Sequence, residues 1–355
     1  MDELIHIDGS IGGGQVLRSA LSLSALTGKP FVIESIRMLR ERPGLMRQHL
    51  TAVQAVARIC GAELRGAELG STRLEFRPGP VQAGDYEFPI GSAGSACLVL
   101  QTVLPPLAVA GGASQLVFEG GTHNPLAPPY PFLDQVFLPI WEKLGLGVER
   151  ELVRAGFYPA GGGRFRVRLE PVERVSRLDL LERGSMRRIW AEASVSNLPI
   201  HIARRELEVV KKRFQLDDAD LLLRTPEAYG PGNVLTICAE FEHATEMVVE
   251  FGAPKLAAER LAERAVRALG RYLASGAAVG EHLSDQLLVP LAMAGSGSFS
   301  TLELTEHARS NISVIERFMP VKFQVESESQ ARTLVKVHPM FEARDEQTGT
   351  DVIAS

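Results

Sequence analysis

Three stretches of the chain share one pattern of apolar and polar positions. Each is mostly apolar and ends in a glycine, the residue that commonly closes a helix. The stretches run over residues 15–28, 98–111 and 282–295. In each, one polar residue stands ten positions before the closing glycine, namely Arg18, Gln101 and Asp285. The recurrence predicts three equivalent helices, each at the start of a structural repeat.

Further elements follow each of these helices in the same order. Strand-like runs lie at 31–36, 114–118 and 298–304, and second helices are expected at 45–59, 132–144 and 311–318. Alternating runs such as 73–77 and 165–169 predict pairs of strands. The predicted unit is therefore βαβαββ, present three times, which places the chain in the α/β (α+β) class.

A segment with its own pattern delays the third repeat and is expected to lie between repeats two and three. It contains predicted strands at 189–195, 234–241 and 247–251 and predicted helices at 203–214 and 255–273. We expect a smaller α+β domain inserted into the larger one. The expected boundaries are 1–181 and 276–340 for the large catalytic domain, 182–275 for the inserted domain and 341–355 for a polar, flexible tail.

The composition narrows the class of protein. Among 355 residues, 38 are Lys or Arg and 43 are Asp or Glu, so the net charge is −5. This excludes a protein that coats nucleic acid through bulk positive charge. The three scattered cysteines, Cys60, Cys97 and Cys238, match neither a disulfide framework nor a zinc site. With no signal peptide and no apolar run long enough to cross a bilayer, a cytoplasmic protein without a membrane partner is expected.

Arginines gather downstream of a glycine-rich helix start. Gly12-Gly-Gly14 opens the first helix, where backbone N–H groups can approach an anion. Four arginines lie within eleven residues of a loop bent by Pro43 and Gly44, namely Arg37, Arg40, Arg42 and Arg47. The guanidinium group matches phosphate oxygens, so the pattern favours a phosphate site over a solvated charge run.

Of the eight histidines, His307 has the most distinctive position. It ends the alternating run 299–306 and is expected to precede the helix at 311–318, so its ring would face the positive end of that helix. A neutral imidazole facing a phosphate is in the right state to attack phosphorus. Glycine-rich strips lie at 120–129 and 156–163. Two interpretations stay open for them: plain turns, or loops whose aromatic and proline faces sandwich a base.

Several segments together resemble the RNA 3′-terminal phosphate cyclases, over about residues 7–337. They include Gly-Gly-Gly-Gln15-Val-Leu-Arg18, Arg47-Gln-His-Leu50, Gly91-Ser-Ala-Gly-Ser95, Gly156-Phe-Tyr-Pro-Ala-Gly-Gly-Gly163, Gly230-Pro-Gly-Asn233 and His307…Asn311. The resemblance is to the bacterial-type, catalytically competent branch. It implies three βαβαββ repeats with a small inserted domain, in agreement with the periodicity.

The resemblance also implies a reaction. An RNA 3′-phosphate is converted to a 2′,3′-cyclic phosphodiester at the expense of ATP, with Mg²⁺ or Mn²⁺ as the divalent cation. The histidine at position 307 takes AMP from ATP and passes it to the RNA 3′-phosphate. The neighbouring 2′-OH then attacks the activated phosphate and AMP leaves. Holding the two reacting groups next to each other supplies much of the acceleration.

Site residues follow by position from the same resemblance. The residues expected to hold ATP or RNA phosphates are Arg18, Arg37, Arg40 and Gln48. Those expected to line the adenosine pocket are Gln15, Gln101, Pro128, Phe132, His282, Asp285 and Gln286. The family's first loop usually reads Gly-Glu-Gly-Gly-Gly-Gln, whereas here it is two residues shorter and lacks the Glu associated with the metal. Asp8 is the candidate replacement.

Three alternatives stay open. A non-catalytic relative of the cyclases, acting in ribosome assembly, would lack the nucleophilic histidine, which His307 argues against. An enolpyruvyl transferase-type enzyme shares the repeated unit but would form no histidine–AMP adduct. A module that only binds RNA ends would bind RNA without ATP turnover. RNA with a 3′-phosphate is the expected partner, and a homodimer is left open.

Overall fold

The computed structural model describes residues 4–11 and 13–340, and its first strands and helices follow the predicted repeat. The first repeat comprises β1 (Ile5–Asp8), α1 (Gly13–Thr27), β2 (Phe31–Glu34), α2 (Arg47–Cys60), β3 (Glu63–Arg65) and β4 (Leu74–Arg77). β1 and β2 are parallel, and β4 pairs antiparallel with both β2 and β3. The strand order is β1-β2-β4-β3.

The second repeat has the same topology. It comprises β5 (Asp85–Pro89), α3 (Ala96–Ala108), β6 (Ser114–Gly120), α4 (Tyr130–Phe132), a π-helical turn (Leu133–Phe137), α5 (Leu138–Lys143), β7 (Gly147–Arg154) and β8 (Gly163–Glu170). Its strand order is β5-β6-β8-β7. The single helix expected at 132–144 is thus divided. Pro139, which has no N–H to donate, stands in the first turn of α5, directly after the π turn.

The third repeat encloses the insertion. It comprises β9 (Leu178–Leu180), α8 (Glu281–Gln286), α9 (Leu288–Ala294), β14 (Gly297–Thr301), α10 (Glu306–Phe318), β15 (Val321–Ser327) and β16 (Thr333–Pro339). β9 runs parallel to β14 in the sheet β9-β14-β16-β15. The insertion therefore interrupts the third repeat after its first strand, rather than separating repeats two and three.

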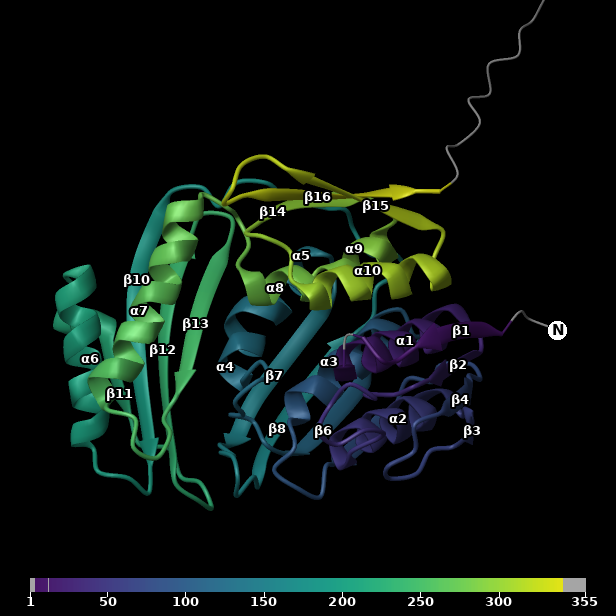
Figure 1. Cartoon of the computed structure of the whole chain (residues 1–355), viewed down its shortest axis with the longest axis horizontal. Coiled ribbons are helices and arrows are strands. Elements are labelled where there is room, and N and C mark those ends of the chain that lie inside the picture. Colours follow the sequence, from purple (N-terminus) through teal and green to yellow (C-terminus); the bar gives the residue numbers. More distant parts are fainter. Residues whose placement is uncertain (1–3, 12, 341–355) are drawn as a thin grey trace, which may run out of the picture.

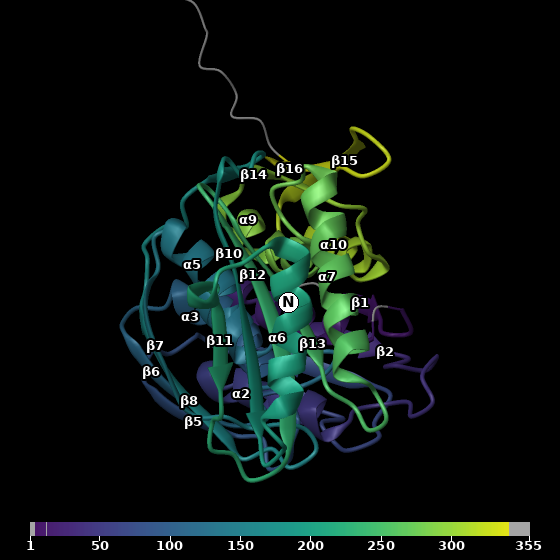
Figure 2. The same ribbon diagram turned by 90° about the vertical axis from the view of Figure 1, so that its left-hand side faces the viewer.

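The repeats turn their helices inward and their sheets outward (Figures 1 and 2). One continuous apolar core joins all three, and its fully buried side chains include Phe31, Trp141 and Phe299, one from each repeat. Because α1, α3 and the α8–α9 pair start equivalent units, this arrangement brings their N-terminal halves toward one another. The centre of the molecule is therefore built from helices of all three repeats.

The insertion forms a separate sheet with its own core. It comprises β10 (Met186–Ser196), α6 (His201–Phe214), a 3₁₀ turn (Asp218–Asp220), β11 (Leu221–Arg224), β12 (Gly232–Phe241), β13 (Thr245–Phe251) and α7 (Ala258–Ser275). The strand order is β11-β10-β12-β13, and α6 and α7 cover the face turned away from the repeats (Figure 2). Trp190 and Met247 instead join the core of the repeats. We propose 182–275 as the inserted domain.

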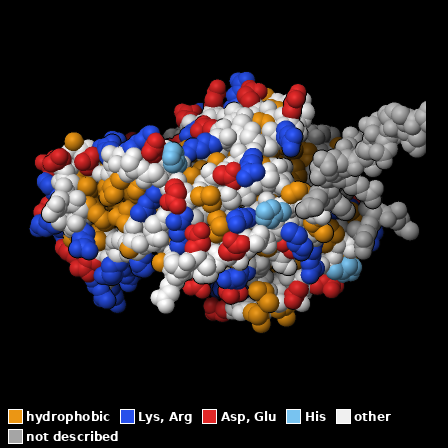
Figure 3. Space-filling view, turned by 90° about the horizontal axis from the view of Figure 1, so that it is seen from above, with side chains coloured by type: hydrophobic (Ala, Val, Ile, Leu, Met, Phe, Trp, Pro, Cys, Tyr) orange, Lys and Arg blue, Asp and Glu red, His pale blue; other side chains and the backbone are white. Residues whose placement is uncertain are grey.

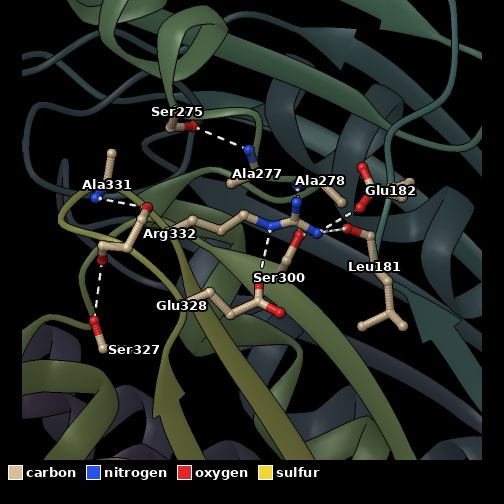
Figure 4. Close-up of polar contacts among 11 residues, drawn as sticks. Leu181, Glu182, Ser275, Ala277, Ala278, Ser300, Ser327, Glu328, Ala331 and Arg332 are labelled. Carbon is tan, nitrogen blue, oxygen red and sulfur yellow. Dashed lines mark hydrogen bonds and ion pairs between the residues drawn. The ribbon is translucent and has the colours of Figure 1, made fainter.

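One polar cluster holds both points where the chain passes between the repeats and the insertion (Figure 4). Arg332 donates hydrogen bonds to the Leu181 carbonyl oxygen at 2.9 Å and to the Glu182 carboxylate at 2.6 Å. Ser300 donates to the same Leu181 oxygen and accepts from the Ala278 N–H on the returning chain. The outgoing and returning segments are thereby tied to the third sheet.

Other expectations from composition can be compared with the structure. The three cysteines are buried and unpaired, as expected. No helix within 4–11 and 13–340 is long and apolar enough to cross a membrane. On the face seen in Figure 3, acidic and basic side chains are interspersed, in line with the small net charge. The predicted tail 341–355 and Gly12 of the glycine-rich loop lie outside the described residues.

Candidate functional site

The three polar residues selected by the repeat pattern meet in one cavity. Arg18 on α1, Gln101 on α3 and Asp285 on α8 all line it, together with Gln15 and Gln286. Each of the three stands at the same place in an equivalent helix, and all three helices point to the centre. Five residues expected at the site from sequence are therefore brought together by the tertiary structure.

Hydrogen bonds connect these side chains within and between repeats. Arg18 donates to the Gln15 amide oxygen at 2.6 Å. Gln101 donates to the amide oxygen of Gln286 at 2.5 Å, which joins the second repeat to the third. Gln286 in turn donates to the His282 carbonyl oxygen at 2.8 Å. The polar lining is thus held in place before any ligand binds.

Burial changes the acid–base properties of the charged pair. It lowers the pKa of Arg18 to about 10, although the charge of Asp285 acts in the opposite direction. It raises the pKa of Asp285 to about 7, opposed by Arg18 and assisted by Glu281. Arg18 therefore stays a cation at neutral pH, while Asp285 is able to donate or accept a hydrogen bond with only a small change of pH.

Asn311 is a cavity residue to which sequence reasoning gave no role. It is 1% exposed, and its side-chain amide donates to the Asp285 carbonyl oxygen at 3.2 Å. Its side-chain oxygen is buried without a hydrogen-bond partner, which leaves an acceptor for a ligand. The available signal was its spacing from His307, because residues four apart share a face of a helix.

His307 lies in the first turn of α10, which begins at Glu306. The expectation that it precedes the helix was wrong, because the helix starts five residues earlier than the pattern indicated. Thr305 caps the helix, accepting a hydrogen bond from the Ala308 N–H at 3.1 Å. The His307 side chain is exposed. It stands one turn before Asn311 on the same side of α10, and it is not among the residues that line the cavity.

The arginine loop lies against the glycine-rich start of α1. The guanidinium of Arg40 comes within 3.4 Å of the position that a Cβ on Gly13 would occupy. Arg37 donates to the carbonyl oxygens of Arg42 and Gly44, so it also shapes the loop that carries Arg40. Burial, and then the charge of Arg40, lowers the pKa of Arg37. The neighbouring cations and the helix start form a site suited to phosphate.

His49 is a second residue near this site that received no role from sequence. Its ring is 3% exposed, and a Cβ on Gly14 would stand 2.6 Å from Nε2. The Met46 N–H donates to Nδ1 at 3.2 Å, so a neutral ring carries its proton on Nε2. Burial, with the charges of Arg18 and Arg37, lowers the pKa of His49 to about 3. The available signal in the sequence was its place in Arg47-Gln-His-Leu50, one of the segments that carry the family resemblance.

The remaining candidates lie outside the cavity lining. His282 is exposed on α8, one turn before Asp285 and Gln286. Gln48 is half-buried, with its Cβ 3.2 Å from where a Cβ on Gly94 would stand. Pro128 is half-buried in its loop, and Phe132 is buried in the core. The roles of these four residues stay predictions.

Two observations limit what the site holds without rearrangement. The space open to water in the cavity is about 50 Å³, room for a few water molecules but not for a nucleoside. Among residues 4–11 and 13–340, no three His, Cys, Asp or Glu side chains gather as a metal site. Asp8 is exposed, and its carboxylate accepts a hydrogen bond from the Ser10 N–H at 2.9 Å. Hydrogen bonding to Ser10 lowers the pKa of Asp8. Within the described part of the chain, the side chains therefore form no cage for a cation.

The chain is similar to known proteins over most of its length. The family model described as RNA 3′-terminal phosphate cyclase matches residues 10–325. A Pseudomonas fluorescens protein named RNA 3′-terminal phosphate cyclase is 51% identical over 95% of this chain and 99% of its own length. One of the same name from Salmonella agona is 46% identical over 95% of this chain and 97% of its own.

Among solved structures, an enolpyruvyl transferase, NikO from Streptomyces tendae, matches 94% of this chain and 48% of its own. The TM-score is 0.37 at 10% identity, too low to support an argument. The family match, in contrast, spans the repeats, the insertion and the cavity. The chain belongs to the RNA 3′-terminal phosphate cyclase family, a family of ligase-type enzymes.

Proposed function

We propose that this protein uses ATP to convert a 3′-terminal phosphate of RNA to a 2′,3′-cyclic phosphodiester through a covalent His307–AMP intermediate. The observation that carries the proposal is the position of His307. It is an accessible imidazole at the start of α10, one turn from Asn311, which lines the cavity where all three repeats meet. Asn311, whose buried side-chain oxygen has no hydrogen-bond partner, and Arg18 line the same cavity and supply it with an acceptor and a cation.

The reaction proceeds in three displacements at phosphorus. A ring nitrogen of His307 attacks the α-phosphorus of ATP, forming an N–P bond as the bond to pyrophosphate breaks. An oxygen of the RNA 3′-phosphate then attacks this phosphorus, and the N–P bond breaks. Finally the 2′-OH attacks the 3′-phosphorus and loses its proton as AMP departs. Adenylation supplies the leaving group that a phosphate monoester lacks.

The binding roles follow from the placement of the side chains. Arg18, Arg37, Arg40 and Gln48 are proposed to hold the phosphates. Gln15, Gln101, Asp285 and Gln286 are proposed to bind the adenosine, with Pro128, Phe132 and His282 around it. Since the cavity holds only a few waters, the nucleoside would enter by displacing them and moving side chains at its mouth. The buried cysteines are in keeping with a cytoplasmic location.

A divalent cation, Mg²⁺ or Mn²⁺, is proposed to reach the site with ATP. Mg²⁺ is commonly held by one or two carboxylates, waters and substrate phosphates rather than by a cage of protein side chains. Asp8 is the candidate carboxylate, but a single carboxylate is not a site by itself.

The test is covalent labelling without RNA. The protein is incubated with ATP labelled at the α-phosphate and Mg²⁺ or Mn²⁺, and the chain is examined for label that is acid-labile and base-stable, as a histidine phosphoramidate would be. His307→Ala is expected to abolish the label. His338→Ala is the matched control, because His338 is also exposed in the third repeat. Full labelling of the His307 variant would remove this residue from the mechanism.

Absence of label from folded wild-type protein would have a different meaning. It would favour a non-catalytic relative or point to the shortened first loop, which lacks the family's Glu. Inserting Gly-Glu before Gly12 separates these cases. Label that appears only after the insertion would show that the loop alone disables the site.

A further inference from the structure

A groove far larger than the central cavity lies where the insertion meets the second repeat. Its volume open to water is about 560 Å³. The lining consists of Arg154 at the end of β7 and two segments of the insertion, 195–198 and 225–229. Its polar side chains include Ser196, Asn197 and Thr225. None of these residues belongs to the proposed adenylylation site.

Tyr229 forms a fixed platform in this groove. The guanidinium carbon of Arg154 lies 4.3 Å from the centre of the Tyr229 ring, and Arg154 Nε donates to the Gly162 carbonyl oxygen at 2.6 Å. A Cβ on Gly162 would stand 2.2 Å from the same ring. The ring is nevertheless 68% exposed. Arg154 therefore covers one face of the ring, the Gly162 backbone lies against the ring, and most of the Tyr229 side chain stays open to solvent.

Two glycine-rich motifs that the ATP site does not use build this platform. A Cβ on Gly232 would stand 2.1 Å from the ring of Phe157, and one on Gly230 would stand 2.4 Å from the Cβ of Ala160. The loop 156–163 of the second repeat and the loop 228–233 of the insertion therefore interlock. Only glycine permits this closeness, so the motifs fix the position of Tyr229 relative to the repeats.

A line of touching loops connects the groove with the phosphate site. Next to the platform, Gly161 approaches Ala93, where a Cβ would stand 2.8 Å from the Ala93 Cα. In the same loop as Ala93, Gly94 lies against the side chain of Gln48. Gln48 lies in the first turn of α2 together with His49, which contacts Gly14 beside Arg18. These contacts pack the loop beside Tyr229 against the loops that carry Gln48 and His49, so the groove and the phosphate site belong to one connected set of loops.

We propose that this groove binds single-stranded RNA upstream of the 3′-terminal phosphate, with one base stacked on the exposed ring of Tyr229. The proposal rests on the proposed function, since the same RNA supplies the reacting end. Aromatic stacking is tolerant of sequence because every base has a π face. The groove contains one cation, Arg154, and one anion, Glu227, so few counterions would be released and the salt dependence of this part of binding would be small.

The test compares RNAs of two lengths that end in a 3′-phosphate, a dinucleotide and a decanucleotide. A terminal 2′-O-methyl group prevents cyclisation, so the dissociation constants can be measured whether or not turnover occurs. Wild-type protein is expected to bind the decanucleotide more tightly. Tyr229→Ala should weaken decanucleotide binding roughly tenfold and leave the dinucleotide unaffected. Tyr229→Phe, which keeps the ring, should behave as wild type.

Two controls separate this proposal from the fold and from the adenylylation chemistry. Met186→Ala removes another exposed apolar side chain of the insertion, 51% exposed at the end of β10 away from the groove, and should leave both affinities unchanged. RNA-free labelling of His307 should be the same in Tyr229→Ala and wild type. Length-dependent binding without any labelling would support the groove while overturning the proposed reaction.

Three results would overturn the proposal that this groove binds RNA. The first is equal affinity of the wild-type protein for the two RNAs. The others are an equal loss of affinity for both RNAs in Tyr229→Ala, and unchanged decanucleotide binding by folded Tyr229→Ala.

Discussion

The second helices of the first and third repeats, α2 and α10, both carry a histidine in their first turn, but in different surroundings. His49 on α2 is 3% exposed, wedged against Gly14, with its Nδ1 occupied by the Met46 N–H. His307 on α10 is exposed. The first turns of two corresponding helices thus carry histidines with opposite exposure. Of the two rings, only that of His307 is open to solvent, as the proposed attack on a nucleotide requires.

Charge sharpens the same contrast. The cations Arg18 and Arg37 add to burial in lowering the pKa of His49 to about 3, so this ring stays neutral throughout the physiological range. A neutral ring next to Arg18 and the glycine-rich loop does not repel the arginines that would hold phosphate. His49 is therefore suited to supporting the phosphate site, and His307 to reacting at it.

The largest expected effect is on the accessible histidine. In His307→Ala, covalent AMP labelling should fall below detection while the melting temperature stays close to that of wild type, because the side chain lost is exposed. Labelling and thermal unfolding, measured on the same preparation, test the expected loss of label and the expected melting temperature. A variant that loses label only because it unfolds would remove the contrast with His49.

Replacement of the buried histidine should have the opposite result. His49→Ala leaves a void beside Gly14 and removes the acceptor for the Met46 N–H, so the free energy of unfolding should fall by about 3 kcal/mol. Label should still form on the protein that remains folded. Denaturant unfolding and labelling at low temperature measure this. If the variant were fully stable but formed no label, His49 on α2 rather than His307 would be required for adenylylation.

The third prediction concerns pH and Asp285, where burial again dominates a neighbouring charge. Its pKa is raised from 3.8 to about 7, so the folded protein retains a proton that the unfolded chain loses. Stability should therefore fall as pH rises from about 4 through 7. Asp285→Asn should remove part of this fall, on the order of 2 kcal/mol, when unfolding is compared at pH 5 and 8.5. Parallel curves for variant and wild type would contradict the shifted pKa.

The smallest predicted effect is at the exposed edge of the phosphate site. Arg40→Ala should weaken ATP binding about tenfold, the contribution of a charge-assisted hydrogen bond, with little change in melting temperature. Arg65→Ala, an exposed arginine on β3 of the same repeat, is the matched control and should bind ATP normally. A large loss of stability in Arg40→Ala would instead make this arginine structural.

Much of the fold and part of the site could be predicted from the sequence. The βαβαββ unit and the matching positions of Arg18, Gln101 and Asp285 in their helices follow from local patterns, since periodicity and closing glycines are properties of short segments. That these residues share one site was implied by the family resemblance alone. The start of α10 was predicted too late because Glu306 to Ser310 lack a clear apolar face. Asn311 and His49 received no role because their importance depends on contacts between elements distant in sequence.

The sequence by itself determined the repeats, the family and the residue types available for phosphate chemistry. The tertiary structure alone decided that the insertion enters after β9, a strand of three residues too short to show alternation. It also decided which histidine is buried and how the glycine-rich loops interlock around Tyr229. The reason is physical: burial, and the pKa shifts that follow from it, depend on what packs against a residue from other segments, which no local pattern contains.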